Sequence, residues 1–267
     1  SINRSPRKSH LFSLMKLFAR TVGTTGTPII ILHGIFGTSD NWLGIAKAFA
    51  ETNRVFLLDQ RNHGQSPWSD EFDYQVMAAD LLEFIEDHAL ENPIIIGHSM
   101  GGKTVMQFGL NYPGIAQKII VVDIAPKFYP VHHTQILAGL NSVDLQAIQS
   151  RNDANDHMKR FEENEGVRQF LLKNLYRNAD GQFAWRINLA VITKNIDVVG
   201  HELFVKNACE TTTYFIKGGN SHYIQPEDER YIAEIFPNFE LIEIPNAGHW
   251  VQADQPEAFV QALKEIL

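Results

Sequence analysis

The sequence contains a single cysteine, Cys209, among 267 residues. It therefore cannot form an internal disulfide, and the chain is not one of the disulfide-stabilised secreted domains. A chain without disulfides is typical of a reducing compartment, so we expect a cytoplasmic location. We interpret Cys209 as a buried, inert thiol.

Basic side chains and long apolar runs are also scarce. The chain has 23 Lys and Arg against 31 Asp and Glu, for a formal net charge of −8. Because affinity for nucleic acid comes mainly from clustered Lys and Arg, this balance argues against a nucleic-acid partner. No apolar run approaches the ~20 residues that cross a bilayer, so we expect no membrane span. Nothing in the sequence distinguishes a monomer from a dimer.

Acidic residues are missing from the N-terminal segment, where none precedes Asp40. Residues 1–14 instead carry Arg4, Arg7 and Lys8. An acid-poor segment of this kind is typical of a transit peptide, and a vector-derived segment before Met15 has the same appearance. We expect residues 1–14 to be a leader or cloning remnant without fixed structure, and we exclude them from the fold.

The most informative stretch is residues 93–102, P-I-I-I-G-H-S-M-G-G. It predicts a buried strand at residues 94–96, then G-x-S-x-G, then a helix starting near Lys103. A strand, a sharp turn and a helix in succession are what a nucleophile elbow requires, with Ser99 at the tip. Gly97 and Gly101 suit positions where a Cβ would clash. The alternative is a glycine-rich turn with an incidental serine.

A second apolar run, residues 29–32, predicts a buried parallel strand that ends in the loop 33–37. Ligands of α/β sheets bind at the carboxyl ends of the strands, so this loop should lie beside Ser99. We expect the backbone N–H groups of Ile35 and Met100 to form an oxyanion hole. The alternative is an ordinary turn. His33 and His98 are interpreted as structural histidines at strand ends.

Strand and helix patterns alternate along most of the chain, which predicts an α/β fold with a mostly parallel sheet and helices on both faces. From residue 128 to about 206 the pattern is helical, without a strong strand signal. We therefore expect a core of residues 15–127 and 207–267, and a helical cap of residues 128–206 over the active-site face. The expected strands are residues 15–22, 29–32, 55–58, 94–96, 119–122, 212–217 and 239–244, and the expected core helices are residues 40–52, 75–88 and 256–267.

The candidate base is His249, which follows a glycine on the loop after the last predicted strand. A catalytic histidine near the chain end fits the order of nucleophile, acid and base in folds with this elbow. The usual place for the acid, the loop 218–223, contains no carboxylate. We predict that Asp123 is the acid, because it ends the strand directly after the elbow, and that Ser221 helps to orient His249 as an uncharged partner. The alternatives are a turn-stabilising role for Asp123 and an acid at Asp228.

Aromatic residues in the cap and nearby loops suggest an enclosed apolar pocket. The adjacent pair His132 and His133 has no further His or Cys at ligand spacing, so we interpret both as surface residues and expect no metal. The aromatic residues predicted to line the pocket are Phe36, Phe128, Tyr129, Trp185 and Trp250, with Phe161 and Phe170 as further cap candidates.

Six motifs carry a family resemblance. Over residues 15–267 the chain resembles α/β-hydrolase-fold serine esterases, in particular the YbfF-type bacterial esterases and the related mammalian abhydrolase-domain-containing protein 11. The resemblance implies hydrolysis of short-chain acyl esters, and in some members acyl thioesters, without cofactor or metal. The motifs are H-G-I-F-G-T-S-D-N-W (33–42), D-Q-R-N-H-G-Q-S (59–66), G-H-S-M-G-G-K (97–103), V-D-I-A-P (122–126), G-G-N-S-H-Y (218–223) and A-G-H-W-V (247–251).

The expected activity is therefore that of a carboxylesterase acting on small-molecule esters with short to medium acyl chains. Ser99 would form an acyl-enzyme, with His249 as the base in both half-reactions. Two other functions stay open. One is that of a carbon–carbon bond hydrolase or menaquinone-pathway lyase of the same fold, and the other is that of a catalytically silent binding module.

Overall fold

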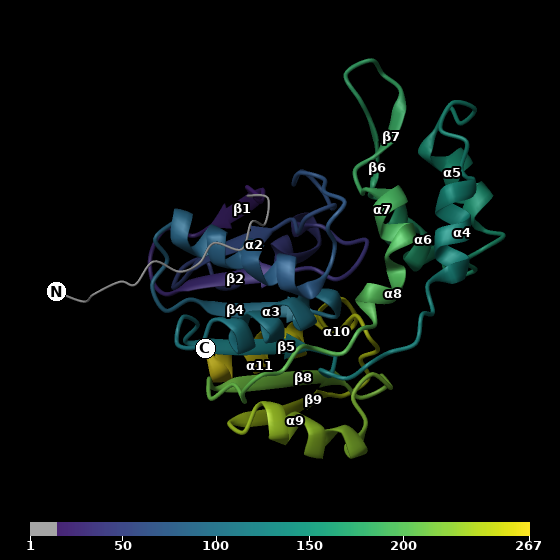
Figure 1. Cartoon of the computed structure of the whole chain (residues 1–267). Coiled ribbons are helices and arrows are strands. Elements are labelled where there is room, and N and C mark those ends of the chain that lie inside the picture. Colours follow the sequence, from purple (N-terminus) through teal and green to yellow (C-terminus); the bar gives the residue numbers. More distant parts are fainter. Residues whose placement is uncertain (1–14) are drawn as a thin grey trace.

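The computed structural model describes residues 15–267, so the expectation for residues 1–14 lies outside the described residues. The described chain forms a seven-stranded sheet with the order β1-β3-β2-β4-β5-β8-β9 (Figure 1). β1 is antiparallel to β3, and the other neighbours are parallel. The strands are β1 (Ala19–Val22), β2 (Pro28–Leu32), β3 (Arg54–Leu58), β4 (Ile94–His98), β5 (Lys118–Val122), β8 (Thr213–Gly218) and β9 (Phe239–Ile244).

Helices cover both faces of the sheet, because both faces of its central strands are apolar. In β2, Ile30 and Leu32 pack into one core cluster, whereas Ile29 and Ile31 pack into the other. The predicted α/β fold class is confirmed. The first cluster includes α2 (Tyr74–Asp87), α3 (Met100–Asn111) and α9 (Glu229–Ile235), and the second includes α1 (Leu43–Lys47) and α11 (Pro256–Ile266).

Two predicted core elements are shorter than the sequence pattern suggests. The expected strand at residues 15–22 begins only at Ala19, and the expected helix at residues 40–52 is a 3-10 turn, η1 (Ser39–Trp42), followed by α1. The backbone after α1 turns against Gly23, where a Cβ would lie only 2.2 Å from the Asn53 carbonyl oxygen. After Lys47 the N–H groups of Ala48 and Phe49 bond to carbonyls three residues back, so the apolar pattern continues in turns and not in an α-helix.

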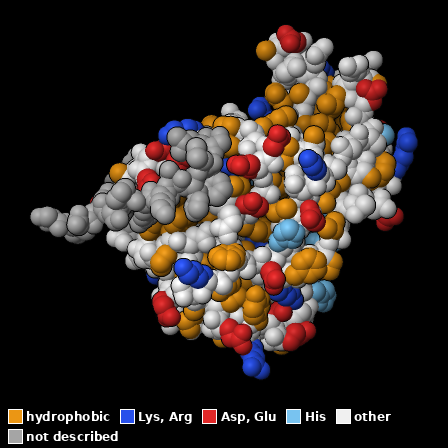
Figure 2. Space-filling model, in the orientation of Figure 1, with side chains coloured by type: hydrophobic (Ala, Val, Ile, Leu, Met, Phe, Trp, Pro, Cys, Tyr) orange, Lys and Arg blue, Asp and Glu red, His pale blue; other side chains and the backbone are white. Residues whose placement is uncertain are grey.

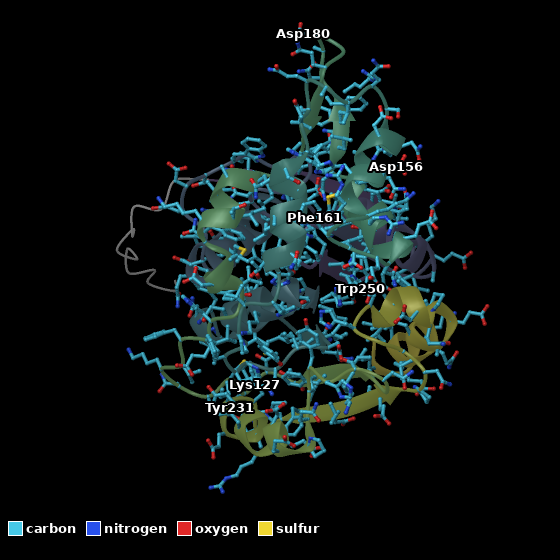
Figure 3. All side chains as sticks on the ribbon, turned by 90° about the vertical axis from the view of Figure 1, so that its right-hand side faces the viewer. Lys127, Asp156, Phe161, Asp180, Tyr231 and Trp250 are labelled. Carbon is cyan, nitrogen blue, oxygen red and sulfur yellow. The ribbon has the colours of Figure 1, made fainter. Side chains whose placement is uncertain are left out.

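The chain leaves the sheet after β5 and rejoins it at β8, and the segment between them lies beyond the carboxyl ends of the strands (Figure 1). This segment contains a β-hairpin, so the prediction that it has no strands is wrong. Its strands, of three residues each, are too short to produce a recognisable alternation. Asp180 marks the tip of the hairpin in Figure 3. The elements are α4 (Thr134–Ser142), α5 (Arg151–Met158), α6 (Glu165–Leu172), β6 (Leu175–Arg177), β7 (Phe183–Trp185), α7 (Leu189–Lys194) and α8 (Ile196–Val199).

One buried lysine joins this segment to the core. The Lys103 ammonium, on α3, donates hydrogen bonds to the carbonyl oxygens of Lys127 at 2.7 Å, Gly200 at 3.3 Å and His201 at 2.5 Å. Lys103 is fully buried, and its burial lowers the pKa of the ammonium to about 7. The three carbonyls lie near the two ends of the segment between β5 and β8, so a single cation holds both ends.

Replacing Lys103 with methionine should therefore destabilise the protein. The change removes three hydrogen bonds and leaves the Lys127 and His201 carbonyl groups without this donor, whereas the Gly200 oxygen still accepts the Tyr129 N–H at 2.7 Å. We expect a loss of about 3 kcal/mol in the free energy of unfolding. Urea denaturation at pH 6, below the pKa of the ammonium, measures this loss in the free energy of unfolding. Lys159→Met is the control, because the Lys159–Asp156 ion pair is more than half exposed and should contribute little. Equal stability of the two variants would contradict the role of Lys103.

Asp and Glu side chains are spread over the face of the molecule in Figure 2, between and around the Lys and Arg side chains. No helix in residues 15–267 has the length and apolar character needed to cross a bilayer.

Candidate active site

Ser99 occupies a sharp turn between β4 and α3. Its backbone has a positive φ of 54°, with ψ −116°. A Cβ added to Gly97 would lie 2.0 Å from the Gly101 oxygen, and one added to Gly101 would lie 2.4 Å from the Leu32 oxygen. The requirement for glycine on both sides of the turn is confirmed. The helix begins at Met100 rather than near Lys103, so its free N-terminal N–H groups follow Ser99 directly.

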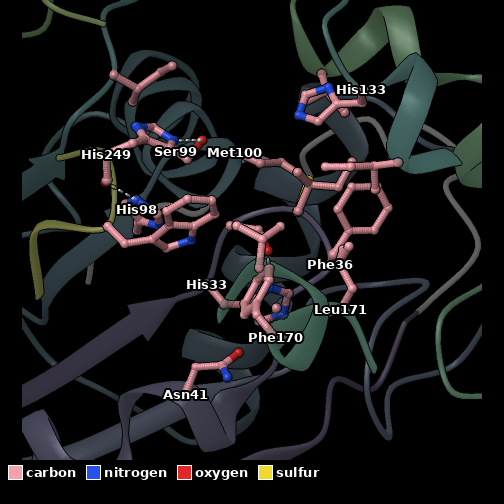
Figure 4. Close-up of a pocket in the computed structure, with 18 of the residues that line it drawn as sticks. His33, Phe36, Asn41, His98, Ser99, Met100, His133, Phe170, Leu171 and His249 are labelled. Carbon is pink, nitrogen blue, oxygen red and sulfur yellow. Dashed lines mark hydrogen bonds between the residues drawn. The ribbon is translucent and has the colours of Figure 1, made fainter. Parts of the chain in front are cut away.

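His249 lies between Ser99 and Asp123. Its Nε2 atom is 3.0 Å from the Ser99 hydroxyl oxygen (Figure 4). Its Nδ1 atom is 2.7 Å from Asp123 Oδ2. Because an ionised carboxylate only accepts hydrogen bonds, Nδ1 carries the proton and Nε2 is left to accept the serine proton. This is the arrangement of nucleophile, base and acid in serine hydrolases.

The Asp123 carboxylate is fully buried and accepts two further hydrogen bonds. The Gly218 N–H donates to Oδ1 at 3.0 Å, and the Ser221 hydroxyl donates to Oδ2 at 2.5 Å. Asp123 itself has a left-handed backbone, with φ 55°. Strained backbone of this kind concentrates at functional sites, where surrounding contacts hold it. The carboxylate is therefore held from three sides.

Ser221 differs in one respect from the prediction. It lies in the usual position of the acid, but its hydroxyl hydrogen bond goes to Asp123 and not to His249. The reason is geometric: the Asp123 carboxylate already occupies Nδ1 of His249, so the hydroxyl donates to the carboxylate and accepts the Tyr223 N–H at 3.3 Å. Ser221 can therefore orient His249 only through Asp123.

Asp228, the alternative acid, is engaged elsewhere. Its carboxylate pairs with the Lys127 ammonium at 2.7 Å and accepts the Gln225 N–H at 2.8 Å. It lies at the end of the 3-10 turn η2 (Pro226–Asp228), next to α9. These contacts give Asp228 a structural role and leave Asp123 as the carboxylate that meets His249.

The loop after β2 lies against the nucleophile. A Cβ on Gly34 would be 3.4 Å from the Ser99 Cβ, so Gly34 permits close approach of the loop. The Gly34 oxygen accepts hydrogen bonds from the Gly37 N–H at 3.0 Å and from His33 Nδ1 at 2.7 Å. Within residues 15–267 the Ile35 N–H has no hydrogen-bond partner. It is thus available, with the first N–H of α3, to a developing oxyanion.

His33 and His98 have structural contacts, as their positions at strand ends suggest. His33 Nε2 accepts the Gln60 N–H at 2.9 Å, and His98 Nε2 donates to the His249 carbonyl oxygen at 2.8 Å. Burial lowers the pKa of both, that of His98 to about 3, so both are neutral near pH 7. His98 thereby supports the backbone of the residue that supplies the base.

A cavity of about 540 Å³ opens at Ser99 and is lined mainly by apolar side chains. Phe36, Tyr129 and Trp250 line it, as predicted, whereas Phe128 and Trp185 do not. Phe128 is 58% exposed, and Trp185 belongs to the hairpin strand β7. Adjacent aromatic residues such as Phe128 and Tyr129 point to different sides, which composition cannot reveal. Of the two further cap candidates, Phe170 lines the cavity and Phe161 does not.

Two residues at the site were missed as functional candidates. The Tyr223 ring stacks on the His249 imidazole, with centroids 3.7 Å apart and planes at 15°, and its hydroxyl contacts His132 Nε2 at 2.7 Å. His133, interpreted as a surface residue, lines the cavity, and burial lowers its pKa to about 4. Of these two residues, only Tyr223 could have been found from the sequence, because it lies in the loop after β8. Among residues 15–267 no group of three or more His, Cys, Asp or Glu could hold a metal ion.

Comparisons with known proteins agree with this geometry. A mouse protein named sn-1-specific diacylglycerol lipase ABHD11 is 35% identical over 90% of this chain and 80% of its own. Esterase YbfF of Escherichia coli is 35% identical over 90% of this chain and 93% of its own. The solved structure of a marine microorganism esterase superimposes with a TM-score of 0.93 at 42% identity, covering 95% of this chain and 100% of that one.

The family model for the alpha/beta hydrolase fold matches residues 27–256, from the start of the parallel sheet to the beginning of the last helix. The matched region includes the elbow, Asp123 and His249. The resemblance noted in the six motifs is confirmed, and the chain belongs to the alpha/beta hydrolase family.

Proposed function

We propose that this protein is a serine carboxylesterase that hydrolyses short- to medium-chain acyl esters through an acyl-enzyme. The observation that carries the proposal is the hydrogen-bonded series Ser99, His249 and Asp123, of which Ser99 and His249 line an apolar cavity. The names of the mouse and E. coli relatives, a lipase and an esterase, support the same class of reaction.

In the first half-reaction Ser99 Oγ attacks the ester carbonyl carbon while His249 Nε2 takes its proton. The negative charge that develops on the carbonyl oxygen is stabilised by the N–H groups of Ile35 and Met100. The Asp123 carboxylate stabilises the imidazolium that forms at His249. Collapse of the intermediate releases the alcohol, which takes the proton from His249. Water then repeats the sequence on the acyl-enzyme and releases the acid.

The cavity supports the small-molecule part of the proposal. Its volume lies within the ~300–1,000 Å³ range of small-molecule pockets, which fits a discrete small-molecule ester. The proposed cap, residues 128–206, closes it with Ile136, Val167 and Phe170. An acyl thioester presents the same carbonyl carbon and a better leaving group, so we include acyl thioesters among the candidate substrates.

An acyl-chain series tests the substrate class. With p-nitrophenyl esters from acetate to palmitate, we expect kcat/KM to be largest for acyl chains of about two to eight carbons and to fall at least about tenfold for palmitate. A parallel series of acyl thioesters measures the preference for oxygen or sulfur. Rapid hydrolysis of long-chain triglycerides at a lipid interface would contradict the proposal.

The preferred substrate distinguishes an esterase from a carbon–carbon bond hydrolase. A dienol-type diketone should be turned over far more slowly than p-nitrophenyl acetate if the protein is an esterase, and the reverse order would favour the alternative. A protein that neither hydrolyses esters nor reacts with a fluorophosphonate at Ser99 would be the silent binding module. For location we keep the cytoplasm as a proposal, supported by the single cysteine, which is free and buried.

A further inference from the structure

Phe36 has an unusual backbone for an aromatic residue. Its φ is 64°, in the left-handed region that bulky side chains rarely adopt. It directly follows Ile35, whose N–H is the proposed oxyanion donor from this loop. Strain of this kind costs about 1–3 kcal/mol and persists only where neighbouring contacts hold it. The contacts that hold Phe36 therefore bear on the oxyanion hole.

The first contact comes from the loop after β3. The Phe36 N–H donates to His63 Nε2 at 3.2 Å, while His63 Nδ1 donates to the Arg61 carbonyl oxygen at 2.9 Å. Because His63 Nδ1 donates to the Arg61 carbonyl, it carries the ring proton, and Nε2 is free to accept the Phe36 N–H. His63 is fully buried, and burial lowers its pKa to about 3, which keeps the ring neutral in the working pH range.

The second contact comes from the cap. The Phe36 carbonyl oxygen accepts a hydrogen bond from Asn174 Nδ2 at 2.8 Å. Asn174 is fully buried just after α6, and its own carbonyl oxygen accepts the Arg186 N–H at 2.8 Å, beside β7. The Asn174 backbone is thus held between α6 and the hairpin, and its side-chain Nδ2 also donates to the Leu171 carbonyl oxygen at 3.0 Å. The two peptide groups of Phe36 are fixed from opposite sides, one by the core and one by the cap.

We propose that Asn174 and His63 are positioning residues for the oxyanion hole, and that the cap thereby takes part in catalysis as well as covering the site. This inference rests on the proposed esterase function. Because peptide groups are planar, fixing the Ile35–Phe36 and Phe36–Gly37 groups anchors the carboxyl side of Ile35 and leaves the Gly34–Ile35 peptide only the φ and ψ of Ile35 about which to turn. The remaining constraint is the pair of bonds to the Gly34 oxygen, from His33 and Gly37. The Ile35 N–H, on the opposite side of that peptide, is then preset for the transition state.

The test compares two buried asparagines of the cap segment. Asn188 Nδ2 also donates to the core, to Asn62 Oδ1 at 3.0 Å, but it does not touch the oxyanion loop. We expect Asn174→Ala to lower kcat about 10- to 100-fold with KM changed less than about threefold, because the lost contact affects the transition state more than the bound ester. Asn188→Ala should keep kcat within about threefold. Affinity for a trifluoromethyl ketone inhibitor, whose adduct carries an oxyanion, should fall with kcat.

Substitutions at His63 supply an independent measurement if Asn174→Ala does not fold. Glutamine can present an acceptor near the position of Nε2, and leucine cannot, so His63→Gln should keep at least about tenfold more kcat than His63→Leu at equal folded content by circular dichroism. Equal effects of Asn174→Ala and Asn188→Ala on kcat and inhibitor affinity would overturn the inference. Equal kcat of the two His63 variants would also overturn it.

The outcome is separable from that of the proposed function. Wild-type protein that hydrolyses esters, with the two asparagine variants behaving alike, refutes only the positioning role. Wild-type protein that hydrolyses no ester refutes the esterase proposal first.

Discussion

Ser99→Ala is expected to abolish ester hydrolysis, lowering kcat by about 10⁴-fold or more, while the fold stays intact. Alanine removes the atom that becomes acylated, and the rest of the site can only bind the ester. The serine side chain is small and partly exposed at the cavity, so its loss opens no core cavity.

Steady-state hydrolysis of p-nitrophenyl acetate and labelling by a fluorophosphonate measure this effect, with circular dichroism as the check on folding. Ser69→Ala is a suitable control, because the Ser69 hydroxyl only accepts the exposed Glu71 N–H. It should keep wild-type activity and labelling. More than a few per cent of wild-type turnover in Ser99→Ala would show that Ser99 is not the nucleophile.

Asp123→Asn should have the second largest effect, a fall in kcat on the order of 10⁴-fold, the scale seen when a triad acid is neutralised in another enzyme. The amide keeps the shape of the carboxylate but cannot stabilise the imidazolium, and it can favour the wrong tautomer of His249. The measurement is kcat for the variant and for wild type at saturating ester, with thermal unfolding followed in parallel.

Two further variants make this result specific. Ser221→Ala removes one of the donors to Asp123 and should lower kcat by only about tenfold, since the direct contact with His249 remains. Asp228→Asn breaks the ion pair with Lys127 and should leave kcat near wild type. If Asp123→Asn stays fully active while Asp228→Asn is inactive, the acid is Asp228 and the assignment above is wrong.

The elbow and the parallel sheet could be predicted because their signals are local. A run of isoleucines, three glycines and a serine within ten residues specify strand, turn and helix together. Once parallel strands are recognised, their carboxyl ends must meet at one edge, so loops far apart in sequence share the site. This reasoning brought Asp123 and His249 into consideration with Ser99.

The segment between β5 and β8 was harder to predict. Its short hairpin strands leave no periodic pattern, and their pairing depends on the turn between them, where Gly181 has φ 77°. Which aromatic residues face the cavity depends on how this segment docks. Tyr129 lines the cavity because its hydroxyl bonds the Ala125 N–H and the Tyr223 carbonyl oxygen, contacts that the neighbouring Phe128 lacks.

The sequence by itself determined the family, the fold class and the two residues proposed for the central chemistry, Ser99 and His249, because short motifs and strand order carry that information. Only the tertiary structure decided that the Ser221 hydroxyl meets Asp123, that Tyr223 stacks on the base, and that Asn174 reaches the oxyanion loop. The last of these contacts joins residues 138 positions apart, and its geometry follows from how the segment between β5 and β8 packs on the loop after β2. Directional hydrogen bonds form only after that docking, so no local pattern encodes them.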